Sequence, residues 1–94
     1  MAYSVEVFGK ENCAQCQAAK AKVTHYLTRQ SLTGQVCLVF HDMGTVDGMA
    51  EGAFRDVKDI PTTIVSADER QLARWDGKVP TTEEFASSLG QAQA

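Results

Sequence analysis

Two cysteines that lie three residues apart, Cys13 and Cys16, constrain this chain more than any other feature. They follow an apolar, strand-like run at residues 3–8 and a glycine, Gly9. If a helix begins near Asn12, both sulfurs lie on one face of its first turn, because positions i and i+3 of a helix are neighbours. The two sulfurs can then form and break a disulfide. In a reducing compartment, such a pair indicates redox catalysis or metal binding.

Apolar periodicity divides the chain into alternating strands and helices. Apolar residues at spacings of three and four after Cys16 predict a long helix, and alternating valines predict a strand before it. We expect Asn12 to cap that helix, with Cys13 as its first residue. The predicted elements are a strand at residues 3–8, a helix at 13–30, a strand at 36–40, a short helix over 49–57, strands at 62–66 and 72–75, and a helix opened by a capping box of Thr81 and Glu84.

The second predicted strand is a continuous apolar run, residues 36–40, of the kind that lies inside a sheet with both faces covered. We therefore expect Cys37, within this run, to be a small core residue. A strand, helix, strand unit implies a right-handed parallel pair, and the loops that follow its strands leave the same edge of the sheet. His41 and Asp42 should then lie near the cysteine loop, where a role in proton transfer is open to them.

Composition excludes several classes of function. A chain of 94 residues suffices for one domain, residues 1–94, with a modest core. The net charge of −3 offers no basic face for nucleic acid. The first residues form neither a basic leader nor an apolar stretch long enough for secretion or for a membrane span. Three cysteines do not make the even framework of a secreted, disulfide-stapled domain. We therefore expect a cytoplasmic monomer without membrane contact.

The two paired cysteines have different predicted environments. Only a thiolate attacks a disulfide, and a free thiol has a pKa of about 8.5. At the helix start, Cys13 feels the positive end of the helix dipole, and Lys10 can bring a full positive charge close; both favour the thiolate. Cys16 lies one turn later on the buried stripe, where desolvation should keep its thiol protonated until it attacks. This asymmetry predicts Cys13 as the nucleophile and Cys16 as the resolving thiol.

The order of the predicted elements, with the C-x-x-C pair before the first helix and Ile60-Pro61-Thr62 before the hairpin, resembles the thioredoxin fold, in particular the glutaredoxins and glutaredoxin-like redoxins. The resemblance covers nearly the whole chain. It implies a three-layer α/β/α architecture in the order β-α-β-α-β-β-α, with a four-stranded mixed sheet. It also implies that Cys13 attacks, that Cys16 resolves, and that Pro61 is a cis-proline beside them. Substrate would then bind across the Ile60 main chain, with Thr62 at the groove.

Two further stretches bear on the electron source. Lys10 stands where many glutaredoxins carry a lysine that meets glutathione, but the Gly-Gly-Cys-Asp type of motif that holds glutathione is missing. Instead, Trp75-Asp76-Gly77-Lys78-Val79-Pro80 looks like the W-x-G-x-x-P stretch of redoxins that donate electrons to ribonucleotide reductase and are recharged by thioredoxin reductase. The resemblance thus implies the flavoprotein thioredoxin reductase, or else glutathione, as the reductant. Trp75 could contact such a partner.

The function predicted from the sequence is that of a thiol–disulfide oxidoreductase that reduces protein disulfides, with no bound cofactor and no metal. Two alternatives remain open. Cys13 and Cys16 could hold zinc together with His25 or His41, or two copies could share an iron–sulfur cluster through the same cysteines. The chain could also be a binding module that keeps the fold for docking without catalysis.

Overall fold

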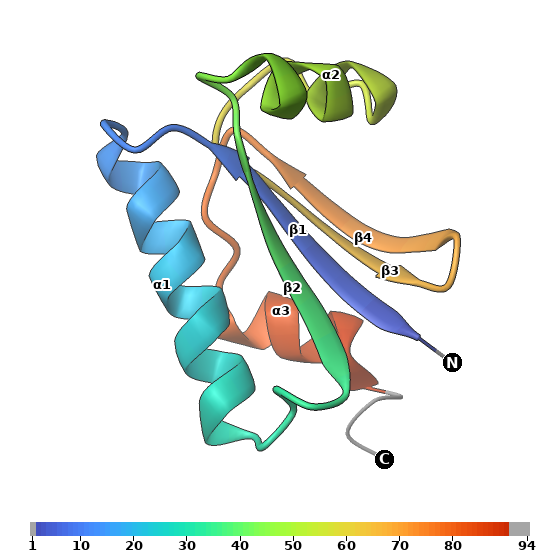
Figure 1. Ribbon diagram of the computed structural model, residues 1–94. Helices are drawn as coiled ribbons and strands as arrows, with labels where there is room; N and C mark the ends of the chain where they lie inside the picture. The colour runs from blue at the N-terminus through green and yellow to red at the C-terminus, as the bar shows by residue number, and fades with distance from the viewer. Residues whose placement is uncertain (1, 91–94) are drawn as a thin grey trace.

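A four-stranded sheet with helices on both faces forms the structure, a computed structural model that describes residues 2–90 (Figure 1). The elements are β1 (Tyr3–Gly9), α1 (Ala14–Arg29), β2 (Val36–Asp42), α2 (Val46–Phe54), β3 (Thr62–Ala67), β4 (Arg70–Asp76) and α3 (Thr82–Ser88). The strand order is β2-β1-β3-β4, with β1 and β2 parallel and the other two pairs antiparallel. This confirms the predicted element order and the mixed sheet.

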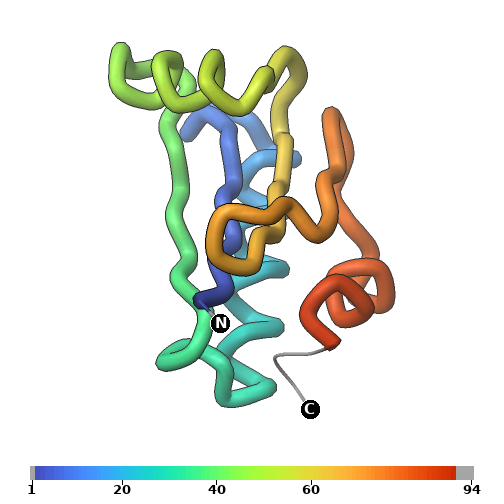
Figure 2. Tube along the Cα trace, turned by 90° about the vertical axis from the view of Figure 1, so that its right-hand side faces the viewer, coloured from blue at the N-terminus to red at the C-terminus, as the bar shows by residue number. Residues whose placement is uncertain are grey.

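Alternating residues of β1 point into two separate cores. Val5 and Val7 are fully buried in the larger core, together with Phe85 of α3 and the apolar stripe of α1. Phe8 points to the opposite face and packs with Ile64 in a smaller core. Figures 1 and 2 show α1 and α3 on one side of the sheet and α2 beside the carboxyl ends of β1 and β2. The sheet is therefore the middle of three layers.

The last helix begins as the sequence predicts. The Thr81 hydroxyl accepts a hydrogen bond from the Glu84 backbone N–H, and the Glu84 carboxylate accepts one from the Thr81 N–H, so the capping box is confirmed. The bond from the Thr81 N–H lowers the pKa of Glu84. Within residues 2–90, no helix has the length and apolar character needed to cross a membrane.

The strand β2 lies at the edge of the sheet, not inside it. Its residues alternate, so Val36 is buried against the larger core whereas Cys37 and Val39 are exposed on the other face. The expectation that Cys37 is a core residue is therefore wrong, and Cys37 is a free, exposed thiol. A continuous apolar run does not distinguish an interior strand from an edge strand with only one face covered.

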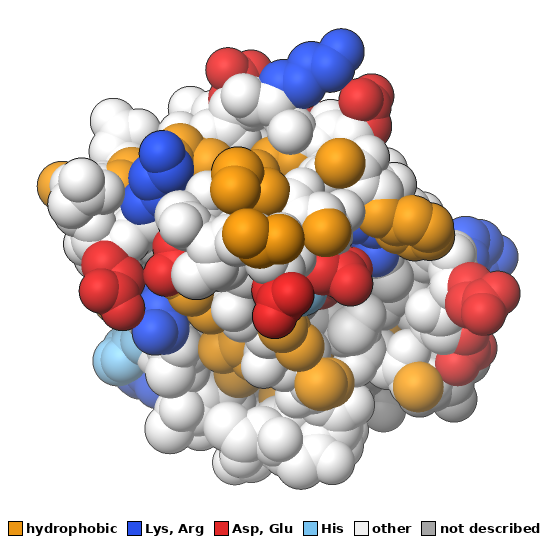
Figure 3. Space-filling view, turned by 45° about the horizontal axis from the view of Figure 1, so that its top comes forward, with side chains coloured by type: hydrophobic (Ala, Val, Ile, Leu, Met, Phe, Trp, Pro, Cys, Tyr) orange, Lys and Arg blue, Asp and Glu red, His pale blue; other side chains and the backbone are white. Residues whose placement is uncertain are grey.

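The helix α2 packs on the sheet through glycines. Its two buried residues are Gly48 and Gly52, while its large apolar side chains Val46, Met49 and Phe54 are 77%, 50% and 84% exposed. Figure 3 shows hydrophobic side chains gathered on the surface over this helix. The large apolar side chains of α2 thus face away from the sheet, and the absence of side chains at the glycines lets the helix lie directly on the end of β2.

Candidate active site

Cys13 caps the N-terminus of α1 and is not its first residue. Its backbone is extended (φ −106°, ψ 112°), and its Sγ accepts a hydrogen bond from the backbone N–H of Cys16, 3.2 Å away. Asn12 is therefore not the cap, contrary to expectation. A turn closed by a hydrogen bond from the Cys13 N–H to the Lys10 carbonyl, 3.2 Å long, precedes the helix and leaves Cys13 at the cap position. The Cys13 sulfur thus faces backbone N–H groups that have no partner within the helix.

Cys13 and Cys16 form a disulfide, with their Cα atoms 5.2 Å apart. The two residues differ in exposure: Cys13 is half-buried, whereas Cys16 is 0% exposed. Cys16 belongs to the inward face of α1, with Ala19 and Val23 following it on the same stripe. Solvent and other molecules can therefore approach the pair through Cys13.

Gly9, the last residue of β1, is part of this site and was missed as such from the sequence. A Cβ atom at Gly9 would lie 2.6 Å from Cys16 Cβ and 2.7 Å from Cys16 Sγ. These distances are shorter than van der Waals contact, so only glycine lets the first turn of α1 lie against the end of β1. The signal in the sequence was a glycine placed between a strand and a reactive motif.

We expect Gly9→Ala to disturb the cysteine pair directly. Because Cys16 Cβ belongs to a rigid helix turn, the added methyl must displace that turn, at a stability cost of about 1 to 3 kcal/mol. Urea unfolding of the oxidised protein measures this cost, and equilibration with glutathione redox buffers measures the closed fraction of the disulfide. Gly34→Ala is the control, since a Cβ at Gly34 meets nothing within 4 Å. A Gly9→Ala protein that equals the Gly34→Ala protein in both measurements would contradict the packing argument.

The peptide bond between Ile60 and Pro61 is cis, as predicted. Thr62 pairs with Phe8 in the antiparallel β1/β3 ladder, so Pro61 lies just beyond the last pair, at the sheet edge where the cysteine loop begins. Pro61 is buried, and its carbonyl accepts a hydrogen bond of 2.9 Å from the Gly77 N–H. Gly77 has a φ of 71°, a left-handed conformation that favours glycine. The glycine of the W-x-G-x-x-P stretch therefore supports the proline segment.

The remaining predicted site residues have different surroundings. Lys10 is exposed in the loop before the cysteines. Thr62 is 0% exposed, and its hydroxyl donates to the Asp59 carbonyl, 2.6 Å away. Trp75 is only 8% exposed and packs near the Phe85 ring in the larger core, with 6.3 Å between ring centroids. Most of the Trp75 surface is therefore used in packing.

His41 and Asp42 are the last two residues of β2, at the predicted edge, and the Met43 N–H that follows them donates to the Gly9 carbonyl over 2.8 Å. The His41 side chain, however, points to the α2 face. It stacks on Phe8, with ring centroids 4.5 Å apart, and its Nε2 lies 2.9 Å from Glu6 Oε2. Asp42 Oδ1 accepts a hydrogen bond from the Gly44 N–H. Neither side chain is directed by these contacts toward the cysteines, so the proton-transfer role has no support.

Comparisons with known proteins agree with this geometry at the level of the fold. No protein-family model matches the sequence, and no curated protein sequence matches it. Solved structures do match. Thioredoxin O2 from Arabidopsis thaliana, in the oxidized state, superposes with a TM-score of 0.77 at 15% identity over 98% of this chain and 76% of that chain. Thioredoxin-2 of the malaria parasite, described as a component of its protein secretion machinery, gives 0.78 at 18% identity over 95% and 82%.

The chain has the thioredoxin fold. A further structure, described as that of a malarial protein, superposes with a TM-score of 0.80 at 16% identity and covers 97% of each chain. The thioredoxin fold explains why the cysteine pair, the end of β1 and the cis-proline meet at one edge of the sheet. At these identities the likeness shows the fold alone.

Proposed function

We propose that this chain is a thiol–disulfide oxidoreductase that reduces protein disulfides through a dithiol–disulfide cycle of Cys13 and Cys16. The observation that carries the proposal is the asymmetry of the pair. Cys13 is half-buried at a helix N-terminus, and its sulfur is bonded to that of Cys16, a residue that is 0% exposed. A substrate can therefore reach the pair only through Cys13, which gives the two cysteines separate roles in the reaction.

The proposed cycle transfers two electrons. The Cys13 thiolate attacks one sulfur of the substrate disulfide, forms a mixed disulfide and expels the other substrate sulfur as a thiolate. The Cys16 thiol then loses its proton and attacks Cys13 Sγ, which releases the second substrate thiolate and leaves Cys13 bonded to Cys16. The substrate is reduced to a dithiol, and this chain is oxidised to the disulfide. An external dithiol or thiol must reduce it again before the next cycle.

The N-terminus of α1 supports the proposed role of Cys13. In the oxidised chain its sulfur already accepts the Cys16 N–H hydrogen bond, over 3.2 Å. The same N–H, together with the positive end of the 16-residue helix, would stabilise a Cys13 thiolate after reduction. Lys10, three residues earlier and exposed, is proposed to add a positive charge beside the incoming substrate.

The proline segment is the proposed substrate groove. Ile60 is partly exposed next to the buried Pro61, so an extended substrate chain can pair with the Ile60 main chain. The Thr62 hydroxyl is already bonded to the Asp59 carbonyl, so we assign Thr62 a main-chain contribution only. Trp75 acts in this proposal by packing, and Gly77 by holding the Pro61 carbonyl.

The zinc alternative has less support from the geometry. His25 follows Cys16 by nine residues in α1, a rise of about 13 Å, which is too far for a shared ion. His41 is bonded to Glu6 on the α2 face of the sheet. Neither histidine can join the cysteines without a large rearrangement.

We propose thioredoxin reductase, in the cytoplasm, as the electron source of a monomeric carrier. The experiment offers the oxidised protein NADPH with either thioredoxin reductase or glutathione plus glutathione reductase, and follows the appearance of thiols and the reduction of a disulfide-bonded protein such as insulin. We expect rapid reduction with thioredoxin reductase. Reduction by the glutathione system alone would overturn this choice of electron source, and failure of the reduced protein to reduce any disulfide would overturn the proposed function.

A further inference from the structure

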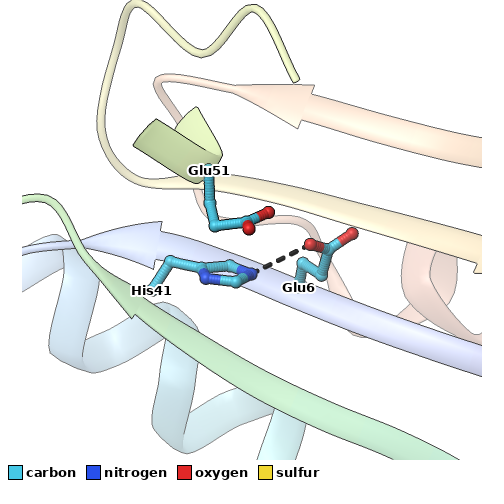
Figure 4. Close-up of side chains that lie close together, drawn as sticks. All are labelled: Glu6, His41 and Glu51. Carbon is cyan, nitrogen blue, oxygen red and sulfur yellow. Dashed lines mark hydrogen bonds and ion pairs between the residues drawn. The ribbon is translucent and has the colours of Figure 1, made fainter. Parts of the chain in front are cut away.

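A second group of ionisable side chains lies on the α2 face of the sheet and takes no part in the proposed thiol chemistry. Glu6 of β1, His41 of β2 and Glu51 of α2 each bring one ligand-type atom to within 4.8 Å of the others. Figure 4 shows the three side chains pointing toward one another from three different elements. The Glu6 and His41 side chains are 13% and 15% exposed, whereas Glu51 is exposed.

The donor set of this group indicates a class of ligand. One imidazole nitrogen and two carboxylate oxygens are ligands that Zn²⁺ and related divalent transition-metal ions accept, whereas Ca²⁺ and Mg²⁺ prefer oxygen ligands alone. The imidazole distinguishes the group from a cluster of surface carboxylates. Three protein ligands would leave a fourth position for water, the arrangement of an open zinc site.

The distances require only small side-chain movements. In a tetrahedral site with metal–ligand bonds of about 2.1 Å, ligand atoms lie about 3.4 Å apart. The His41 Nε2 to Glu6 Oε2 distance of 2.9 Å must therefore open by about 0.5 Å, and the metal would replace the proton now shared in that hydrogen bond. Glu51 has to move inward, which its exposed position on α2 permits. The Phe8 ring, stacked on His41, holds the imidazole in place.

Arg55 orients Glu6 without using the oxygen that faces His41. Its Nη1 donates to Glu6 Oε1 at 2.5 Å, and its Nη2 donates to Ser66 Oγ at 3.3 Å. Outer partners of this kind fix the orientation of a metal-binding carboxylate. With Arg55 counted as +1, the two glutamates as −1 each and a neutral imidazole, the group carries a net charge of −1. A cation is therefore favoured even beside the guanidinium.

We propose that Glu6, His41 and Glu51 bind one divalent transition-metal ion of the Zn²⁺ class, which fastens α2 to the sheet. The cysteines are not ligands. The site is independent of the proposed redox function, so either proposal can fail without the other.

The test uses oxidised protein that carries Cys37→Ser, so that the paired cysteines are in the disulfide and the exposed thiol is removed. Zn²⁺ is titrated by calorimetry, and Co²⁺ is followed by its visible absorption. We expect one ion per chain, and affinity weakened about tenfold or more by Glu51→Gln or by His41→Phe. Phenylalanine keeps a ring on Phe8, and Glu51 is at the surface, so both variants preserve the packing of the sheet. Asp47→Asn, an exposed carboxylate of the same helix, is the control and should bind as the parent does.

Thermal unfolding gives a second readout. Zn²⁺ should raise the melting temperature of the parent and of Asp47→Asn by the same amount, and that of Glu51→Gln by clearly less, because an ion that binds the folded state more weakly stabilises it less. No saturable binding to the parent would overturn the proposal. Equal affinity in Glu51→Gln and Asp47→Asn would also overturn it, since carboxylates would then bind the ion without a defined site.

Discussion

Cys13→Ser should lose all catalysed disulfide reduction, while Cys16→Ala should stop after one step with substrate attached to Cys13. Serine is the more informative replacement at position 13, because Cys13 is the N-cap of α1 and serine is among the best N-cap residues. The hydroxyl can take over the hydrogen bond from the Cys16 N–H, so the helix start is kept while the nucleophile is removed. Loss of activity can then be assigned to chemistry and not to unfolding.

At position 16 alanine is preferable, because Cys16 is 0% exposed and an apolar residue fits its surroundings. Without the resolving thiol, the Cys13 mixed disulfide should accumulate, and mass spectrometry of the reaction with a disulfide-bonded protein should show the covalent adduct. The measured rate of reduction with dithiothreitol as electron source should fall to the uncatalysed rate for Cys13→Ser.

Cys37→Ser provides the matched control for both variants. Cys37 is exposed on the edge strand β2. Its replacement should therefore leave the rate of disulfide reduction unchanged, and no covalent adduct should accumulate. If the adduct formed in Cys13→Ser and not in Cys16→Ala, the two roles would be reversed. If Cys13→Ser kept its activity, the thiol cycle itself would be wrong.

The sequence was sufficient for the element order, because this order follows from periodicity and from the crossover rule. The cis bond before Pro61 was implied by the family resemblance. It was not sufficient for the first turn of α1. Asn12 and Cys13 are adjacent, and either side chain can accept a hydrogen bond from the helix start. The turn between Lys10 and Cys13 determines that Cys13 is the cap. Helix-capping preferences of single residues do not predict such a turn.

The position of β2 could not be predicted for a different reason. The apolar run at residues 36–40 predicts a strand. It does not predict whether that strand has one neighbouring strand or two, which decides between an edge and an interior position. Similarly, His41 lies near the end of β2, at the predicted edge, but the face of the sheet to which its side chain points depends on the register of the strand. It pairs with Phe8, and both side chains point to the α2 face, whereas Val7 points to α1. A shift of one residue exchanges the two faces.

The helix α2 shows where propensity and packing disagree most. Gly48 and Gly52 make the segment a weak helix former, so the sequence predicts a short and labile helix. In the structure these glycines are the buried contact of α2, and its apolar side chains are exposed. A property that weakens the isolated helix is what allows the folded helix to approach the sheet.

Gly48→Ala should therefore destabilise the protein, although alanine favours an isolated helix by about 1 kcal/mol relative to glycine. A Cβ at Gly48 would lie 1.7 Å from the carbonyl oxygen of Asp42 and 2.4 Å from its carbonyl carbon. Both are backbone atoms at the end of β2, so no side-chain rotation relieves the overlap and α2 must lift from the sheet. We expect a loss of about 3 kcal/mol or more in the free energy of unfolding, measured by urea denaturation.

Two other glycines give this prediction a graded control. At Gly52 a Cβ would lie 2.6 Å from Met43 Cε and 2.8 Å from Met43 Sδ, the mobile end of a flexible side chain, so Gly52→Ala should cost clearly less than Gly48→Ala. At Gly34 a Cβ meets nothing within 4 Å, so Gly34→Ala should be neutral or slightly stabilising. The order of stabilities should be Gly34→Ala, Gly52→Ala, Gly48→Ala, from highest to lowest. Helix propensity alone predicts that both replacements in α2 stabilise the protein, so a Gly48→Ala protein at least as stable as the parent would show that α2 does not pack on β2 through Gly48.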